Sequence, residues 1–207
     1  MVVCDAFRIF VRDKVNNWAT QMIYLNDDIA RFDLQAALPL LSAQRREQCL
    51  RFKHEQGRKT CAAAFLLLMT GLRQEYGIEE PPLLEYGEHG KPFIAGRPDI
   101  HFNISHCLQA VICVISDKPV GVDIEGFRKY SESLVRYTMN EEEIRQIQQA
   151  EHPELEFTRL WTMKEAVVKC TGEGISGRSM KEVLADVPYQ ITTVVNTEKN
   201  YIYSITT

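Results

Sequence analysis

The sequence Gly-Val-Asp-Ile-Glu at positions 121–125 has the alternation that is typical of a β-strand with one buried face. Residues two apart on a strand point to the same side, so Asp123 and Glu125 should project together while Val122 and Ile124 face the core. An isolated Asp-x-Glu pair usually lies on a solvated strand face. These carboxylates follow strongly apolar sequence, however, which favours a functional site over a solvated face.

The sequence Trp-Thr-Met-Lys-Glu-Ala-Val-Val-Lys at positions 161–169 is instead typical of a helix. Residues four apart share a helix face, so Trp161, Glu165 and Lys169 should lie on one side. If that side faces the strand, three carboxylates converge beside a lysine, and their mutual repulsion requires a cation. Oxygen ligands suit Mg²⁺, which usually takes further ligands from substrate phosphates. The two segments together predict a magnesium–pyrophosphate site.

The overall composition is that of an ordinary globular protein. At 207 residues the chain is long enough for one large domain or two small ones, and 25% of its residues are charged. The net charge of −4 gives no general attraction to nucleic acid or to an anionic membrane. We therefore expect no nucleic-acid or membrane partner, and any anion site must be built locally.

The cysteines and the apolar segments bear on the compartment. Six cysteines are scattered along the chain, without a Cys-x-x-Cys motif or a histidine at zinc spacing, so we expect a reducing, cytoplasmic setting. Residues 1–10 include Asp5 and Arg8 and are not expected to form a signal peptide. The most apolar run, residues 61–69, is far shorter than the ~20 residues of a membrane-spanning helix.

Apolar periodicity predicts a buried helix at residues 57–76 and a second long helix that begins near Pro153 and ends before Gly172. Asn140 and Glu143 resemble a capping box that opens a further helix. Strands are expected at residues 7–11, 83–86, 100–106, 110–116, 121–125, 191–195 and 201–205. The turn at 117–119 predicts a hairpin between the strands on either side of it.

The order of these elements, strands then a long helix then strands, occurs twice along the chain. This order predicts an α+β fold with two similar α+β halves in one chain, related by a pseudo-twofold axis. We expect an N-terminal half of residues 1–100 and a C-terminal half of residues 101–207. The active site is expected in the cleft between them.

Polar residues gather in the strand predicted to begin at His101. His101, Asn103 and Ser105 share one face of this strand, and His106 lies on the other. A single strand histidine is usually bonded to a backbone carbonyl in the core. Four polar side chains at one strand end instead indicate ligation of phosphate or hydroxyl groups.

Two basic features are weak when each is taken alone. The basic residues from Arg45 to Lys59 are typical of a solvated helix face. Lys91, in the sequence Gly-Lys-Pro, is typical of a surface turn.

Four motifs together resemble the 4′-phosphopantetheinyl transferases of the surfactin-synthetase-activating (Sfp) type. They are Gly-Lys-Pro at 90–92, Phe-Asn-Ile-Ser-His at 102–106, Gly-Val-Asp-Ile-Glu at 121–125, and Trp-Thr-Met-Lys-Glu-Ala at 161–166 with Lys169. The resemblance covers roughly residues 40–177, in the expected order and spacing. Four motifs in register are far more specific than any one of them.

Members of this family transfer the phosphopantetheine arm of coenzyme A to a serine of an acyl, peptidyl or aryl carrier protein, and release 3′,5′-ADP. The resemblance therefore implies coenzyme A as substrate, Mg²⁺ as cofactor and an apo carrier protein as partner. It also implies the two-halved fold with coenzyme A in the cleft. A monomer is expected, because paired halves in one chain remove the need for a dimeric site.

The resemblance also implies a role for each matched position. Metal ligands would be Asp123, Glu125 and Glu165, and the catalytic residues would be Glu165 (also a candidate base for the serine), Lys169 and Lys164. The pyrophosphate would be contacted by Lys169 and His106, with support from Ser105 and Lys164. The adenine pocket would be lined by His89, Gly90, Lys91 and Pro92, and the 3′-phosphate would be bound by Arg45 and Lys59.

Two positions depart from the family pattern. Lys59 stands where an arginine often lies, and Gln48 occupies a position that is often basic. A lysine supplies charge without a bidentate fork, so discrimination for the 3′-phosphate is expected to be weaker.

Other functions and the carrier surface stay open at this point. One alternative is a different Mg²⁺-dependent phosphotransferase that acts on a nucleotide. The other is a non-catalytic protein that binds coenzyme A or a carrier. Docking of an acidic carrier helix would need a local basic patch, for which the candidates are Phe127, Arg128, Lys129 and Arg136.

Overall fold

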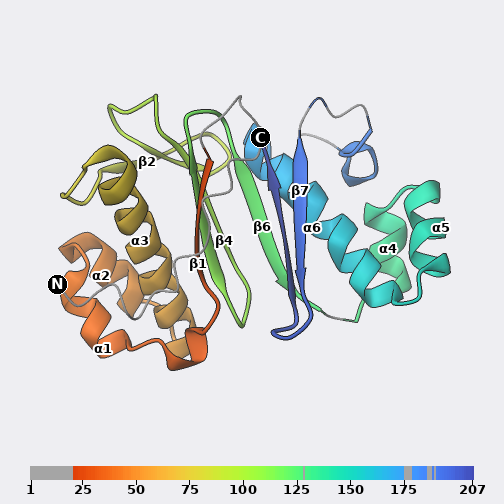
Figure 1. Cartoon of the computed structure of the whole chain (residues 1–207), viewed down its shortest axis with the longest axis horizontal. Helices are drawn as coiled ribbons and strands as arrows, with labels where there is room; N and C mark the ends of the chain where they lie inside the picture. Colours follow the sequence, from red (N-terminus) through yellow and green to blue (C-terminus); the bar gives the residue numbers. More distant parts are fainter. Residues whose placement is uncertain (1–20, 128, 175–178, 186–187, 189) are drawn as a thin grey trace.

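The computed structural model of the chain describes residues 21–127, 129–174, 179–185, 188 and 190–207, shown in Figure 1. Its strands are β1 (Gln21–Asn26), β2 (Leu84–Tyr86), β3 (Pro92–Ile94), β4 (His101–His106), β5 (Val111–Ser116), β6 (Gly121–Gly126), β7 (Ile191–Asn196) and β8 (Tyr201–Thr206). Its α-helices are α1 (Leu34–Ala37), α2 (Ala43–Leu50), α3 (Glu55–Tyr76), α4 (Glu132–Thr138), α5 (Glu141–Gln149) and α6 (Pro153–Thr171). The 3-10 helices among these residues are η1 (Ile29–Arg31), η2 (Leu38–Leu40) and η4 (Met180–Glu182). In this part of the chain no helix is long and apolar enough to cross a membrane.

The N-terminal sheet has the strand order β1-β5-β4, with both neighbouring pairs antiparallel. Every residue of β5 is buried, because the strand is covered on both faces. One face, with Cys113 and Ile115, belongs to the core that α3 forms over the sheet. Gly71 of α3 permits this packing, since a Cβ there would lie 2.3 Å from Cδ1 of Ile115. The continuous apolar sequence of β5 thus reflects a strand at the centre of the molecule.

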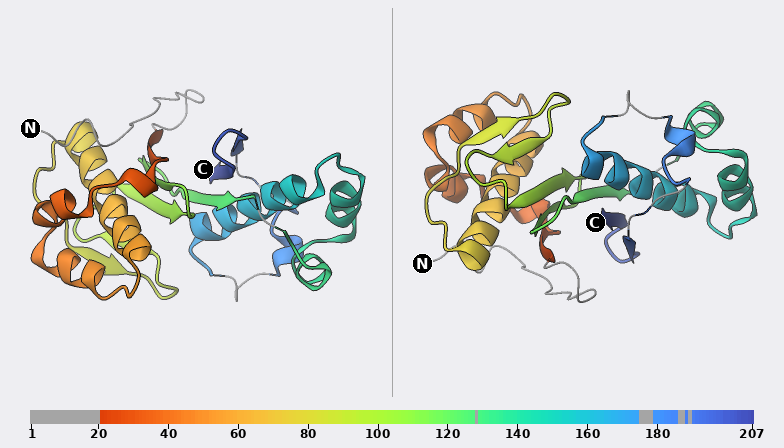
Figure 2. Two further views of the ribbon diagram at one scale, coloured as in Figure 1. Left: turned by 90° about the horizontal axis from the view of Figure 1, so that it is seen from below. Right: turned by 90° about the horizontal axis from the view of Figure 1, so that it is seen from above.

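The other face of β5 packs against the second sheet. Ile112 and Val114 of β5 share a buried cluster with Val122 and Ile124 of β6. This second sheet has the order β6-β8-β7 and is also antiparallel throughout. Both views in Figure 2 place α3 and α6 on opposite sides of the central strands, so the sheets lie between the two long helices.

Helix α6 lies very close to strand β6 at Gly121. A Cβ on Gly121 would be 2.0 Å from the carbonyl oxygen of Ala166 and 2.4 Å from the amide nitrogen of Cys170. Real Cβ atoms do not approach backbone this closely, so only glycine allows the contact. The glycine that opens the strand motif therefore sets the distance between β6 and α6, and with it the distance between their polar side chains.

The two sheets are joined by hydrogen bonds from backbone to side chain along β4 and β6. The amide of Val122 donates to Oδ1 of Asn103 at 2.8 Å, and the amide of Ile124 donates to Oγ of Ser105 at 3.3 Å. Both bonds join positions 19 residues apart, so β4 and β6 run side by side in the same direction. We call this junction the β4–β6 seam.

The two sheets have the same strand order. In each sheet the strand that comes last in the sequence lies in the middle, between the other two. This order is β1-β5-β4 in the first sheet and β6-β8-β7 in the second. The predicted mixture of helices with antiparallel sheets is confirmed. The pseudo-twofold relation and the division at residue 100 stay predictions. Strand β5 pairs with both β1 and β4, so all three strands of the first sheet precede the turn between β5 and β6.

Several local predictions can be compared with the structure. The closing hairpin of β7 and β8 is confirmed, and so is the capping box of Asn140 and Glu143 at the start of α5. The hairpin predicted around residues 117–119 is wrong, because β5 pairs with β1 and β4 whereas β6 pairs with β8. The strand expected at residues 7–11 and the docking candidate Arg128 lie outside the described residues.

Candidate active site

Asp123 on β6 is the centre of a polar cluster between β4, β6 and α6. Its Oδ1 accepts hydrogen bonds from Oγ of Ser105 at 2.8 Å and from Nζ of Lys169 at 2.6 Å. The same ammonium lies 3.0 Å from Oγ of Ser105, so the three side chains form a closed triangle. Residues from three predicted motifs are thereby brought together.

The second carboxylate oxygen of Asp123 is buried and has no hydrogen-bond partner among the described residues. Asp123 as a whole is only 4% exposed. Leaving a buried acceptor unsatisfied costs about 1–3 kcal/mol, so such an atom points to a ligand that supplies the missing contact. A cation or a hydrogen-bond donor would satisfy it.

Glu165 of α6 belongs to the same electrostatic environment. Burial raises its pKa above the ordinary value of 4.5, and the negative charges of Asp123 and Glu125 raise it further, against the opposing charge of Lys169. Burial and then the charge of Lys169 lower the pKa of His106, whereas Asp123 opposes this shift. Asp123 and Lys169 therefore lie close enough to influence both Glu165 and His106.

The titration of Glu165 in the metal-free protein provides a direct test of this cluster. We expect its carboxyl group to lose its proton above pH 4.5, because burial and Asp123 both disfavour the ionised form. The substitution Asp123→Asn removes one negative charge and should shift the midpoint of Glu165 to lower pH. Carbon-detected NMR of the carboxyl resonance measures both midpoints. Asp99→Asn, which changes a surface carboxylate paired with Arg97, is the control. If the titration midpoint of Glu165 is not lower in the Asp123→Asn variant than in the wild type, the two carboxylates are not close to each other.

A cavity of about 300 Å³ opens beside this cluster. Its lining joins the loop before β3 to β4 and to the C-terminal end of α6: His89, Gly90, Lys91, Pro92, Asn103, Ile104, Glu165, Val168, Lys169, Gly172 and Gly174. The ammonium of Lys91 does not enter the cavity as a free charge, because it donates to the carbonyls of Val120 at 3.1 Å and Cys170 at 2.9 Å. Lys91 thereby fixes this loop to the last turn of α6.

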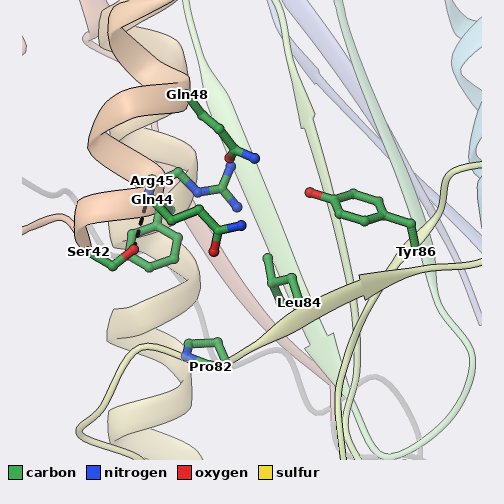
Figure 3. Close-up of a pocket in the computed structure, with 8 residues that line it drawn as sticks. Ser42, Gln44, Arg45, Gln48, Pro82, Leu84 and Tyr86 are labelled. Carbon is green, nitrogen blue, oxygen red and sulfur yellow. Dashed lines mark hydrogen bonds between the residues drawn. The ribbon is translucent and has the colours of Figure 1, made fainter.

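Arg45 lines a different and smaller hollow of about 30 Å³ between α2 and β2. Figure 3 shows Gln44, Arg45 and Gln48 projecting from α2 toward Tyr86 of β2. The guanidinium of Arg45 lies over the ring of Phe65, 5.0 Å from its centroid. Gln44 and Tyr86 were not predicted as site residues. The one signal in the sequence is that positions 44 and 48 share a helix face next to Arg45.

Two lysines that the family resemblance assigns to the site are paired with other groups of the protein. Lys59 pairs with Glu55 at 3.2 Å and donates to the carbonyl of Ala30 at 3.1 Å, and it does not line the hollow beside Arg45. Lys164 is fully buried and pairs with Glu143 at 2.8 Å. The ammonium of Lys164 is therefore already bound inside the protein, and its expected support of the pyrophosphate region stays a prediction.

The expected convergence of Asp123, Glu125 and Glu165 on a metal ion stays a prediction. In the portion of the chain that the structure describes, no three acidic, histidine or cysteine side chains stand in an arrangement that could hold a metal ion. Lys169 lies against Asp123 instead. The donor set still suits Mg²⁺ in kind, since it is made of carboxylates and includes a buried oxygen without a partner.

The comparisons with known proteins agree with the motifs. Residues 119–202 match the 4′-phosphopantetheinyl transferase superfamily. A 4′-phosphopantetheinyl transferase of Bacillus subtilis is 31% identical over 159 residues, which are 74% of this chain and 70% of that protein. The 4′-phosphopantetheinyl transferase psf-1 of Bacillus pumilus is also 31% identical, over 77% of this chain and 70% of that protein. The transferase HetI of Nostoc sp. strain PCC 7120 is 28% identical over 79% of this chain and 71% of that protein.

The family model and the curated relatives identify the chain as a transferase enzyme. The chain belongs to the 4′-phosphopantetheinyl transferase family, and within it to the Sfp type.

Proposed function

We propose that the protein transfers the 4′-phosphopantetheine group of coenzyme A to a serine of an apo acyl, peptidyl or aryl carrier protein. In this reaction the serine oxygen forms a bond to the β-phosphorus, the bond from that phosphorus to the bridging oxygen breaks, and 3′,5′-ADP leaves. The observation that carries the proposal is the triangle of Asp123, Ser105 and Lys169 beside a cavity of about 300 Å³.

The side chains of the cluster can perform the steps that this reaction needs. Lys169 places a positive charge where negative charge grows on the phosphate oxygens, and His106 lies close to it. Glu165 is the candidate base for the serine proton, because its carboxylate lines the cavity beside Lys169. Ser105 holds the carboxylate of Asp123 in place through its hydroxyl group.

We assign Mg²⁺ to Asp123, Glu125 and Glu165, as the family resemblance implies. The unpartnered oxygen of Asp123 supports this assignment, as do the repulsive charges around Glu165. A bound Mg²⁺ would stabilise negative charge on the pyrophosphate oxygens. Because Lys169 now contacts Asp123 at 2.6 Å, we expect this contact to lengthen when the ion binds.

Intact-protein mass spectrometry tests the reaction and the metal together. An apo carrier protein is incubated with this protein, coenzyme A and Mg²⁺, and one phosphopantetheine adduct is expected, which EDTA should prevent. Fatty-acid, peptidyl and aryl carriers are tried in parallel. Coenzyme A binding without any adduct would favour a non-catalytic binding protein. Turnover of a nucleotide without coenzyme A would favour a different phosphotransferase.

We propose that the hollow beside Arg45 receives the 3′-phosphate of coenzyme A. The charge of Arg45 and the polar groups of Gln44, Gln48 and Tyr86 that face it support this proposal. With Lys59 held by Glu55, Arg45 is the cation that lines this hollow among the described residues. Recognition of the 3′-phosphate should therefore depend strongly on one side chain.

The substitution Arg45→Ala should raise the KM for coenzyme A about tenfold or more, because a charged hydrogen bond to the phosphate is lost. The KM for 3′-dephospho-coenzyme A should change little, since that substrate lacks the group. Steady-state kinetics with both substrates measures the ratio. Arg46→Ala is the matched control, because Arg46 follows on the same helix and donates to the carbonyl of Leu38. Equal loss with both substrates would exclude this role for Arg45.

We also propose that the protein is a monomer and that it is located in the cytoplasm. Both sheets contribute to the cluster within one chain, which supports a monomeric site. Five cysteines in the described residues, Cys49, Cys61, Cys107, Cys113 and Cys170, are free thiols, which suits a reducing compartment.

A further inference from the structure

Lys164 sits in a fully buried pocket that is distinct from the active site. Its Nζ lies 2.8 Å from Oε1 of Glu143 on α5 and donates at 2.6 Å to the carbonyl oxygen of Met180 in η4. Its side chain has no exposed surface, and that of Glu143 is 7% exposed. A charge buried this deeply is held only where geometry and hydrogen bonds compensate the loss of water.

Glu143 connects this ion pair to the start of α5. Its second oxygen, Oε2, accepts from the amide of Asn140 at 2.8 Å, while the side chain of Asn140 accepts from the amide of Glu143 at 2.9 Å. The side-chain Nδ2 of Asn140 also donates to the backbone carbonyl of Lys181, at 3.4 Å. The pair therefore joins α5, α6 and the 3-10 helix η4 in one network, which we call the α6 anchor.

The α6 anchor and the cavity contact helix α6 through different residues. Successive helix residues are turned by about 100°, so Lys164 and Glu165 necessarily point in different directions. Lys164 points toward α5 and η4, whereas Glu165 and Lys169 line the cavity. A second restraint acts on the β6 side, where Gly121 lies against the backbone of Ala166 and Cys170. The orientation of Glu165 and Lys169 is thus fixed from two sides.

We infer that Lys164 and Glu143 are positioning residues, which hold α6 in the rotation that places Glu165 and Lys169 against Asp123. The inference rests on the proposed transfer reaction, because the loss of kcat that it predicts is measured in that reaction. In this role Lys164 does not contact the substrate. Its ammonium binds Glu143 and the carbonyl of Met180, and Lys169 contacts the pyrophosphate. Burial lowers the pKa of Lys164, and the hydrogen bond with Glu143 opposes that shift and favours the charged form.

A double-substitution cycle tests the inference. Lys164→Met leaves the carboxylate of Glu143 buried without its partner, and Glu143→Gln leaves the ammonium of Lys164 in the same condition. Glutamine keeps an oxygen acceptor for the amide of Asn140, so the cap of α5 is retained. We expect each single variant to lower kcat about 10- to 100-fold through misplacement of Glu165 and Lys169, with the KM for coenzyme A changed less than about twofold. The double variant removes both charges together and should recover most of kcat.

A role of Lys164 on the phosphate predicts a different pattern. Lys164→Met and the double variant would then be equally inactive, and Glu143→Gln would be close to the wild type. Loss that affects KM as much as kcat would also overturn the positioning role. Arg145→Met is the matched control, since Arg145 forms an exposed pair with Glu142 on the same helix α5 and should have no effect.

A structural measurement separates failure of this inference from failure of the proposed function. Amide hydrogen exchange of residues 164–171 is compared in the wild type, both single variants and the double variant. Faster exchange in the single variants and recovery in the double variant support the α6 anchor, even if no carrier protein is modified. Unchanged exchange in both single variants overturns it. A single variant that does not fold leaves the double variant and the other single variant to decide.

Discussion

Replacing Glu165 by glutamine is expected to lower the rate of phosphopantetheine transfer about 100- to 10,000-fold, the range that a positioned general base contributes. Glutamine has nearly the same shape but cannot take a proton from the carrier serine. The substitution also removes the negative charge at position 165, and with it the repulsion between that charge and the carboxylates of Asp123 and Glu125. Coenzyme A should therefore still bind, and the defect should appear in kcat.

Two measurements are needed for this variant. Intact-mass kinetics on an apo carrier gives the rate of transfer, and isothermal calorimetry gives the dissociation constant for coenzyme A. Glu154→Gln is the matched control, because Glu154 is an exposed glutamate in the first turn of the same helix. Near-normal turnover by Glu165→Gln would remove Glu165 from the role of base.

The substitution Gly121→Ala should cause the largest loss of stability in the chain's functional region. The added Cβ would lie 2.0 Å from the carbonyl oxygen of Ala166 and 2.4 Å from the amide of Cys170. These are backbone atoms of a long helix, so neither can move aside as a flexible side chain would. We expect a loss of about 3 kcal/mol in the free energy of unfolding, the upper part of the range for overpacked sites. The melting temperature should fall by ~6–12 °C.

Gly87→Ala provides the comparison for this prediction. A Cβ at Gly87 meets only the carbonyl oxygen of Lys91, at the ordinary contact distance of 3.7 Å. Differential scanning calorimetry should show a melting temperature close to that of the wild type. If the melting temperatures of Gly121→Ala and Gly87→Ala differ by less than about one degree, the close approach of β6 and α6 does not require glycine at position 121.

Much of the active site followed from the sequence by simple periodicity. The two-residue repeat of β6 correctly separates Val122 and Ile124, which lie in the apolar core, from Asp123, which is buried in the polar cluster. The four-residue repeat of α6 correctly placed Glu165 and Lys169 on a common face. Both rules describe a single element, and they hold whatever that element packs against.

The errors concern contacts between elements, which no local pattern contains. The short turn after β5 predicts a hairpin, but the strands pair instead with β1 and β8, which are distant in sequence. Lys164 and Lys169 are both lysines on one helix, and only the neighbours decide that one is buried against Glu143 while the other reaches Asp123. The motif alone could not distinguish them.

The β4–β6 seam has a consequence for how this protein can lose activity. Oγ of Ser105 accepts from the amide of Ile124 and also donates to Asp123, so one atom takes part in both the junction of the sheets and the polar cluster. Any small shear between the two sheets would disturb both contacts at once. We therefore expect a fragment that carries only one of the two sheets to lack transferase activity, because the polar cluster forms only where both sheets meet.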